Sequence, residues 1–242
     1  MQAIGIIPAR WASSRFPGKP LAPIAGRPMI QWTWEGATRS RKLRDVVIAT
    51  DDERIVEAAR HFGANVVLTG SSHPTGTDRL AEVAVQLDDE IVVNIQGDEP
   101  LIEASVLEAL IDALVDAPDA AMSTVVHPLA DDAAGDPNRV KARLDPAGRA
   151  IDFARQPSDP GFDWQHAGLY AYRRTFLLEF VALEQTERER TEGLEQLRAL
   201  EHGHIIQAAI VDDWHSLPVD VPADIAAVEL ALQARGDSKQ KR

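Results

Sequence analysis

The chain has 242 residues, 45% hydrophobic and 26% charged, which is typical of one large globular domain. It contains no cysteine, which excludes disulfides, thiolate metal sites and a cysteine nucleophile and suits a reducing cytoplasm. The net charge of −13 argues against nucleic-acid binding, because a phosphate backbone needs a basic face. No apolar run is long enough to cross a bilayer, and the opening MQAIGIIPAR lacks the basic leader of a signal peptide. We therefore expect no membrane insertion and a cytoplasmic location.

The first half of the chain alternates short apolar runs with helix-like segments. The pattern predicts strands over 3–7, 45–49, 64–68, 90–95 and 121–126, and helices over 28–40, 52–62, 77–87 and 103–116. This βαβ series predicts a mostly parallel sheet that is doubly wound, with helices on both faces.

The second half is less regular. Strands are predicted over 140–144, 150–154, 168–172 and 205–211, and helices over 175–183, 190–202 and 222–234. The break in alternation indicates a mixed sheet with an inserted segment. No linker rich in Gly, Ser or Pro divides the halves, so the chain is predicted to be a single domain over 1–242. The overall class is α/β.

A basic loop, PARWASSRFPGKPL, follows the first strand over residues 8–21. The first 34 residues contain four basic residues and no acidic one, so the rest of the chain carries −17. Arginine forks, a lysine and backbone amides can all bind phosphate oxygens, which favours a compact anion site over a merely basic surface loop. Neither a Walker spacing nor GxGxxG is present. Trp11, inside the loop, is a candidate stacking platform.

Two further strand ends carry acidic residues. In ATDDE, residues 49–53, Thr50 or Asp51 can cap the following helix. In NIQGDEP, residues 94–100, Asp98 follows a buried strand and a glycine, where a carboxylate can bind Mg²⁺ or be an ordinary turn residue. No HExxH or GxSxG occurs, so neither a zinc site nor an α/β-hydrolase triad is supported.

The segment IIPARWASSRFPGKPLAPIAGRPMI closely resembles the opening of the 3-deoxy-manno-octulosonate (Kdo) cytidylyltransferases. The resemblance continues, in the family's order, through VIATDDERI, TGTDRLAEV, IVVNIQGDEPLI, NRVKARLDPAGRAIDFAR, HAGLYAYRR, GLEQLRALEHG and VDVPADI. It covers residues 3–225.

The resemblance implies a nucleotide-diphospho-sugar transferase-like fold and an enzyme that couples CTP to Kdo with Mg²⁺ as cofactor. The products would be pyrophosphate and CMP-Kdo, for lipopolysaccharide biosynthesis. It further implies a nucleotide-binding half over 1–127, a sugar-binding and dimerisation portion over 128–215, and a metal-ligand loop and helix over 216–235. A homodimer is expected on the same ground.

The resemblance also implies roles for individual residues. The catalytic residues would be Arg10, Lys19, Asp98 and Asp220, of which Asp98 and Asp220 would bind the metal. Those around the nucleotide would be Pro8, Ala9, Arg10, Ser14, Arg15, Lys19, Ala49, Thr50, Thr77, Arg79 and Gln96. Those around the sugar would be Gln96, Arg155, Gln156, His166, Tyr170, Glu195 and Gln196.

The sugar residues fit the predicted elements. His166 and Tyr170 are four residues apart and so fall on the same face of a strand. In the predicted helix over 190–202, Leu194, Leu197 and Leu200 would pack while Glu195 and Gln196 point toward the pocket.

The chain departs from the family's pattern in two places. ARQPSDP, residues 154–160, stands where SRSPIP or SRAPIP is usual, and VDVPADI replaces VDTPEDL. An 8-amino-Kdo or another small anionic acid is therefore an alternative acceptor. A sugar-1-phosphate nucleotidyltransferase is a second alternative, although its GxGTRL-type loop is absent. A nucleotide-binding protein without catalysis is a third, against which the presence of Lys19, Asp98 and Asp220 speaks.

Overall fold

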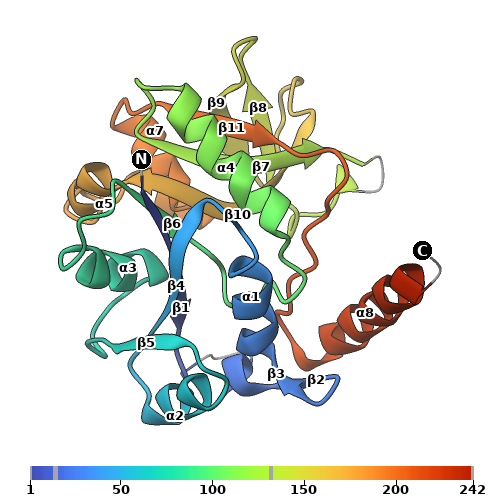
Figure 1. The fold of residues 1–242 in the computed structure, drawn as a ribbon. Coiled ribbons are helices and arrows are strands. Elements are labelled where there is room, and N and C mark those ends of the chain that lie inside the picture. The colour runs from blue at the N-terminus through green and yellow to red at the C-terminus, as the bar shows by residue number, and fades with distance from the viewer. Residues whose placement is uncertain (1, 13–15, 131–132, 241–242) are drawn as a thin grey trace.

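A computed structural model describes residues 2–12, 16–130 and 133–240 of the chain, with side chains given as far as residue 235. Within these residues, nine strands form one sheet in the order β5-β4-β1-β6-β10-β7-β11-β9-β8 (Figure 1). The strands are β1 (Ala3–Ala9), β4 (Leu43–Thr50), β5 (Asn65–Leu68), β6 (Ile91–Asn94), β7 (Met122–Pro128), β8 (Lys141–Leu144), β9 (Arg149–Ala154), β10 (Trp164–Arg173) and β11 (Ile206–Ile210). The short strands β2 (Pro23–Ile24) and β3 (Arg27–Pro28) form a separate hairpin.

The parallel sheet predicted for the first half of the chain is confirmed for the strands β1, β4, β5 and β6. β1 pairs in parallel with β4 on one side and β6 on the other, and β5 extends the sheet beyond β4. The strand β1 is apolar on both faces because helices cover both sides of the sheet. Since the chain builds outward from β1 first on one side and then on the other, the sheet has a switch point between β1 and β6, where ligands of open α/β sheets bind.

The second half of the sheet is mixed, as the broken alternation predicted. β10 runs antiparallel between β6 and β7, while β11 is parallel to β7. β9 and β8 follow in antiparallel pairing, and β8 also pairs with Trp164 and Gln165 of β10. The sheet therefore curls back on itself at this end, so "mostly parallel" describes only the first half.

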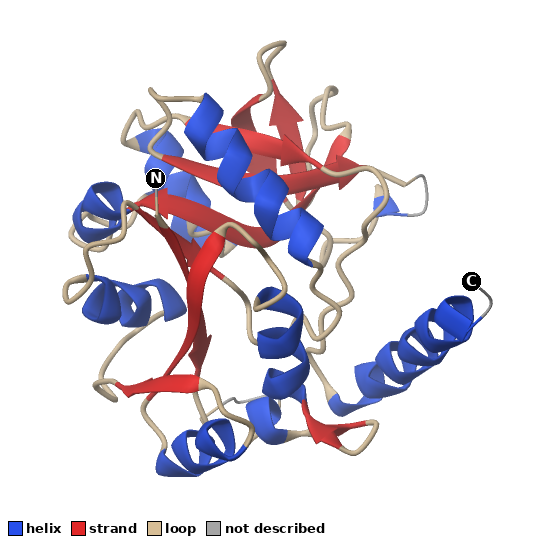
Figure 2. Cartoon of the chain, in the orientation of Figure 1, coloured by secondary structure: helices blue, strands red, loops and turns tan. Residues whose placement is uncertain are grey.

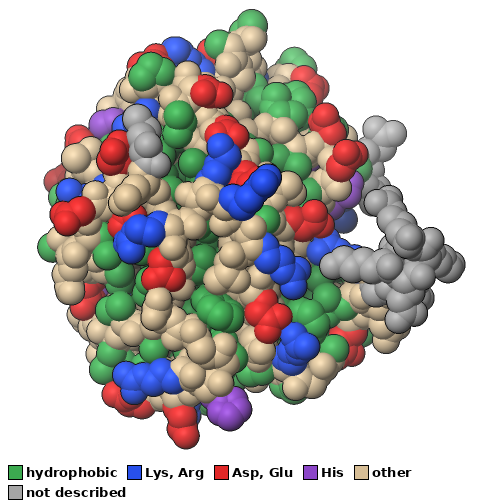
Figure 3. Space-filling view, in the orientation of Figure 1, with side chains coloured by type: hydrophobic (Ala, Val, Ile, Leu, Met, Phe, Trp, Pro, Cys, Tyr) green, Lys and Arg blue, Asp and Glu red, His purple; other side chains and the backbone are tan. Residues whose placement is uncertain are grey.

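Helices cover both faces of the sheet, in agreement with a doubly wound fold (Figure 2). The helices α1 (Met29–Ala37), α2 (Glu53–His61) and α4 (Ala104–Asp116) contribute to one hydrophobic core. The helices α3 (Gly76–Ala84), α5 (Arg174–Phe180) and α7 (Gln196–Glu201) contribute to the other. Acidic and basic side chains are scattered over the face seen in Figure 3, with hydrophobic atoms between them.

The predicted helix over 190–202 is wrong in one respect: it is two helices. α6 (Glu187–Glu192) begins with a capping box between Thr186 and Glu189 and ends at Gly193, which adopts φ 62°. A left-handed glycine terminates a helix, so α7 starts afresh in a new direction. Leu194 and Leu197 are buried, as predicted, and Leu200 packs against the same core.

The last helix, α8 (Ile225–Gln240), follows the 3-10 turn η3 (Pro222–Asp224) and projects from the body of the molecule (Figure 1). Its base is anchored by Val228, which packs with Ile24, Met29 and Val219. The Glu229 carboxylate also accepts a hydrogen bond from the Ala25 amide, at 2.7 Å. These contacts hold the first turns of α8 and the preceding Val219 against the rest of the fold. Over the described ranges, no helix combines the length and hydropathy needed to cross a membrane.

Candidate active site

A cleft of about 430 Å³ opens at the carboxyl ends of β1 and β6. This is the switch point of the sheet, where two neighbouring loops diverge and leave space between them. Its lining residues are Pro8, Ala9, Arg10, Lys19, Pro20, Met29, His73, Pro74, Thr75, Gly76, Arg79, Gln96, Gly97, Asp98 and Asp220. Eight of these were predicted as site residues: Pro8, Ala9, Arg10, Lys19, Arg79, Gln96, Asp98 and Asp220.

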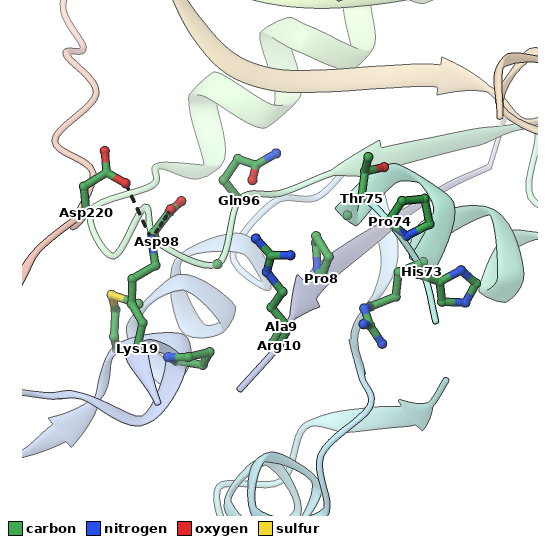
Figure 4. A pocket seen from close by; sticks show the side chains of 15 residues that line it. Pro8, Ala9, Arg10, Lys19, His73, Pro74, Thr75, Gln96, Asp98 and Asp220 are labelled. Carbon is green, nitrogen blue, oxygen red and sulfur yellow. Dashed lines mark hydrogen bonds and ion pairs between the residues drawn. The ribbon is translucent and has the colours of Figure 1, made fainter. Parts of the chain in front are cut away.

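One end of the cleft holds a lysine between two carboxylates. The Lys19 ammonium lies 2.6 Å from Asp98 Oδ2 and 3.8 Å from Asp220 Oδ1, and donates to the Val219 carbonyl at 2.9 Å (Figure 4). Lys19 begins the 3-10 turn η1 (Lys19–Leu21), and Gly18 before it adopts φ 73°, a conformation that favours glycine. Three distant segments of sequence therefore converge at this end of the cleft.

These residues suit a magnesium ion. Two carboxylate side chains already surround one cation, the Lys19 ammonium, so a positive charge is stabilised at this place. Mg²⁺ takes one or two protein carboxylates and completes its shell with water and substrate phosphates. Among the described residues there is no group of three or more His, Cys, Asp or Glu side chains that could hold a metal ion.

The loop after β1 forms the floor of the cleft. Figure 4 shows Arg10 between Asp98 and Pro8, and its side chain is exposed to solvent. Trp11 does not line the cleft: the Arg54 guanidinium lies 3.4 Å from the centre of its ring. The tryptophan therefore packs against α2 and is no open stacking platform. The predicted phosphate ligands Ser14 and Arg15 lie outside the described residues.

The opposite end of the cleft comes from the turn that precedes α3. His73, Pro74 and Thr75 line it, and Thr75 forms a capping box with Asp78. The helix predicted from the sequence begins at residue 77, so this turn was not among the predicted site residues. The pattern TGTD is itself a capping signal, which could have located it.

Arg79 lies behind that turn, on α3, and is almost completely buried. Its guanidinium forms an ion pair with Asp51 at 3.0 Å and donates to the Thr69 hydroxyl. The helix after β4 is capped by Asp52, which accepts from the Arg54 amide at 3.0 Å, so the expected capping role of Thr50 or Asp51 is wrong. Asp51 instead holds Arg79 at the cleft.

Three predicted nucleotide residues are near the cleft but do not line it. Ala49 and Thr50 end β4 beside Pro8 and Ala9 of β1, and both are fully buried. Thr77 is also buried, and its hydroxyl donates to Glu195 Oε2 at 2.6 Å.

Four of the predicted sugar residues form a polar cluster behind Thr77, in which His166, Tyr170 and Gln196 are buried and Glu195 is part-buried. The Tyr170 hydroxyl donates to Gln196 Oε1 at 3.0 Å, and the rings of Tyr170 and His166 are 5.6 Å apart, as expected of one strand face. Glu195, at the start of α7, accepts from Thr77, and burial raises the pKa of its carboxyl. Burial lowers the pKa of His166 to about 3, so this imidazole is neutral, with Nε2 2.8 Å from the Thr124 hydroxyl.

Arg155 and Gln156 lie apart from this cluster. The Arg155 guanidinium donates to the Glu192 carbonyl at 2.7 Å, next to the bend at Gly193, while Gln156 is exposed. Lys141, which is buried, donates to the Arg155 carbonyl at 2.9 Å and so fixes the start of the unusual ARQPSDP segment.

A doubly wound α/β sheet with a cleft of basic and acidic side chains at its switch point is typical of α/β proteins that bind nucleotides. The sequence profile of the cytidylyltransferase family matches residues 4–207. The 3-deoxy-manno-octulosonate cytidylyltransferase of Myxococcus xanthus is 46% identical over 97% of this chain and 98% of its own length. That of Pseudomonas syringae pv. tomato is 47% identical over 95% and 97%. The chain belongs to the 3-deoxy-manno-octulosonate cytidylyltransferase family.

Solved structures agree with this assignment. A CMP:2-keto-3-deoxy-manno-octonic acid synthetase complexed with CTP superposes with a TM-score of 0.91 at 37% identity, covering 98% of this chain and all of the other. A 4-diphosphocytidyl-2C-methyl-D-erythritol synthase from Anaerococcus prevotii reaches 0.65 at 16% identity over 96% and 99% of the two chains, which shows a shared fold.

Proposed function

We propose that this cytidylyltransferase transfers CMP from CTP to the anomeric hydroxyl of Kdo, giving CMP-Kdo and pyrophosphate. The observation that carries the proposal is the convergence of Lys19, Asp98 and Asp220 at one end of the cleft. The match with relatives of that activity along nearly their whole length supports it. Following the resemblance, the product would serve lipopolysaccharide biosynthesis in the cytoplasm.

In the proposed reaction the sugar hydroxyl oxygen forms a bond to the α-phosphorus of CTP. The bond from that phosphorus to the bridging oxygen breaks, pyrophosphate leaves with the electron pair, and the hydroxyl proton passes to solvent. Negative charge collects on phosphoryl oxygens, so positioned cations supply most of the catalysis. Lys19 and Arg10 are the described cationic side chains at the cleft that suit this task, and neither must act as a nucleophile.

We propose that Asp98 and Asp220 hold Mg²⁺ together with phosphate oxygens of CTP. When bound, the ion supplies positive charge that neutralises the phosphates and steadies the leaving group. The Lys19 ammonium offsets one of the two negative charges of these carboxylates, so the pair keeps a net charge of −1 that a divalent cation would compensate. In the proposed reaction the ammonium would leave this ion pair and turn toward the phosphates of CTP.

The cytosine end of CTP would lie against His73, Pro74 and Thr75, at the other end of the cleft. Gln96 stands between the two ends and would contact both substrates (Figure 4). Kdo would enter on the side of Tyr170, Gln196 and Glu195, with Arg155 and Gln156 near the carboxylate of the sugar. The tie between Thr77 and Glu195 joins the two substrate regions and supports this arrangement.

We also propose a homodimer formed through the second half of the chain. Ile151 and Ile210 are 51% and 46% exposed, on the paired strands β9 and β11. Exposed apolar side chains in this half of the chain suit contact with a second copy, and the register places these two at different ends of the strand pair.

Pyrophosphate release with combinations of nucleotide and acceptor tests the proposed function. We expect release with CTP and Kdo in the presence of Mg²⁺, and little with UTP or dTTP. Including 8-amino-Kdo tests whether the ARQPSDP segment changes the acceptor. Release with UTP or dTTP and a sugar 1-phosphate would support a sugar-1-phosphate nucleotidyltransferase instead, and no release with any pair would support a non-catalytic nucleotide-binding protein.

A further inference from the structure

Glu99 is a buried acid next to the cleft. Its residue is 4% exposed, it directly follows Asp98, and its Oε1 accepts a hydrogen bond from the Ser216 hydroxyl. Its Oε2 has no hydrogen-bond partner among the described residues. Burying such a group is costly, and its retention here therefore calls for a specific role.

The partner of Glu99 belongs to the segment that delivers Asp220. Ser216 and Leu217 lie in the loop between β11 and α8, and the chain reaches Asp220 four residues after Ser216. A second hydrogen bond joins the same two segments: the Val219 amide donates to the Asp98 carbonyl at 2.9 Å. The Lys19 ammonium also donates to the Val219 carbonyl and so contacts the same segment.

The Val219–Asp98 and Ser216–Glu99 hydrogen bonds fix different parts of the segment. The backbone bond from Val219 sets the spacing of the segments beside the carboxylates. The Glu99–Ser216 bond fixes the approach of the loop several residues earlier. Two separated contacts determine the direction of a segment, whereas one contact leaves it free to pivot. The direction of this segment decides whether the Asp220 carboxylate faces Asp98.

We propose that Glu99 is a positioning residue which, through the Ser216 hydroxyl, holds Asp220 opposite Asp98 so that both can bind one divalent cation. This inference rests on the proposed function for the identity of the cation and nucleotide. It assigns Glu99 no contact with substrate. Groups that orient metal ligands typically change metal affinity or activity by about 10–100-fold when they are removed.

The test compares Ser216→Ala with Ser216→Thr, because threonine keeps the hydroxyl. Ser123→Ala is the matched control, since Ser123 is buried and its hydroxyl donates to the Leu110 carbonyl at 2.7 Å, away from the cleft. Binding of Mn²⁺ in the presence of CTP, followed by electron paramagnetic resonance, reports on the cation without turnover. Mn²⁺ serves as probe because it prefers the same oxygen ligands as Mg²⁺.

We expect Ser216→Ala to weaken Mn²⁺ binding by about 10-fold or more, while Ser216→Thr and Ser123→Ala stay within about threefold of the wild type. In turnover, the Mg²⁺ concentration for half-maximal rate should rise in Ser216→Ala with an unchanged KM for Kdo. Equal Mn²⁺ affinity in Ser216→Ala and wild type overturns the inference, as does an equal loss in Ser216→Ala and Ser216→Thr. If the wild type binds Mn²⁺ with CTP but makes no CMP-Kdo, the proposed function fails, and the Mn²⁺ comparison still decides the role of Glu99.

Discussion

The Lys19 ammonium lies 2.6 Å from Asp98 Oδ2, in a part-buried ion pair that joins the loop after β1 to the loop after β6. Asp220 approaches the same ammonium to 3.8 Å. One positive charge therefore keeps two carboxylates close together. Removal of any of the three groups alters the charge balance of the other two, which makes this cluster the most sensitive point of the cleft.

Lys19→Met should lower kcat/KM by about 10²–10³-fold, because a positioned cation that stabilises phosphoryl charge is removed. Steady-state pyrophosphate release measures this effect. Lys42→Met is the control, since Lys42 forms a comparable 2.5 Å ion pair with Asp112 on the surface. Equal kcat/KM values for Lys19→Met and Lys42→Met would contradict a catalytic role for Lys19.

Asp98→Asn should remove nearly all turnover while CTP binding survives in part. The substitution keeps the shape of the side chain but removes the charge that a hard cation requires. Calorimetric titration with CTP and the turnover assay separate the two effects. Asp112→Asn serves as the control on the protein surface. Near-normal turnover of Asp98→Asn would rule out the metal role.

Thr77→Val should destabilise the fold by about 1–3 kcal/mol, because it removes the hydrogen bond at 2.6 Å from the buried Thr77 hydroxyl to the part-buried Glu195 Oε2. Valine has nearly the same shape, so the change removes the hydrogen bond and little packing. Urea unfolding measures the free energy of unfolding. Thr191→Val removes a hydroxyl that donates to the Glu187 carbonyl on the exposed side of α6 and should cost much less. Equal costs in the two variants would mean that the Thr77–Glu195 bond contributes no special stability.

His166 should make the fold more stable at pH 7 than at pH 5. Burial lowers its pKa to about 3 in the folded state, whereas the unfolded value is about 6.5, so the unfolded chain binds the additional proton as the pH falls between these values. The free energy of unfolding should therefore lose about 2 kcal/mol from this residue between pH 7 and pH 5.

His166→Gln should reduce the fall in stability over this pH range by about that amount, even if the variant is less stable throughout. His127, whose pKa is also lowered by burial, remains in both proteins and cancels from the comparison. The exposed His61 gives the control variant His61→Gln. An unchanged pH dependence in His166→Gln would mean that folding does not shift the pKa of His166, which contradicts the prediction.

The predictable parts of the fold were those with strong local patterns. The apolar run Ile91–Asn94 and the following Gly97 placed a buried strand and its loop correctly, and hence Asp98. The break at Gly193 was missed because the leucines that follow it, Leu194, Leu197 and Leu200, recur at helical spacing and the polar residues before it were assigned to the same helix. Here a left-handed glycine overrides the hydrophobic period.

The candidate site was predictable where its residues come from motif-bearing loops, as with Lys19 and Gln96. Contacts between distant side chains were not, because they depend on packing that no local pattern encodes. Asp51 was expected to cap a helix and instead holds Arg79, and Glu99 was passed over although it binds Ser216. The buried state of Tyr170 and His166 likewise follows from the curled end of the sheet.

The most direct test of the account is the identity and stoichiometry of the products from CTP and Kdo with Mg²⁺. Phosphorus magnetic resonance follows pyrophosphate and the CMP ester together in one sample. We expect CMP-Kdo and pyrophosphate in equal amounts. Neither product should form when Kdo is omitted, or when the Asp98→Asn variant replaces the wild type. Formation of free CMP independent of Kdo, or no reaction of CTP at all, would contradict it.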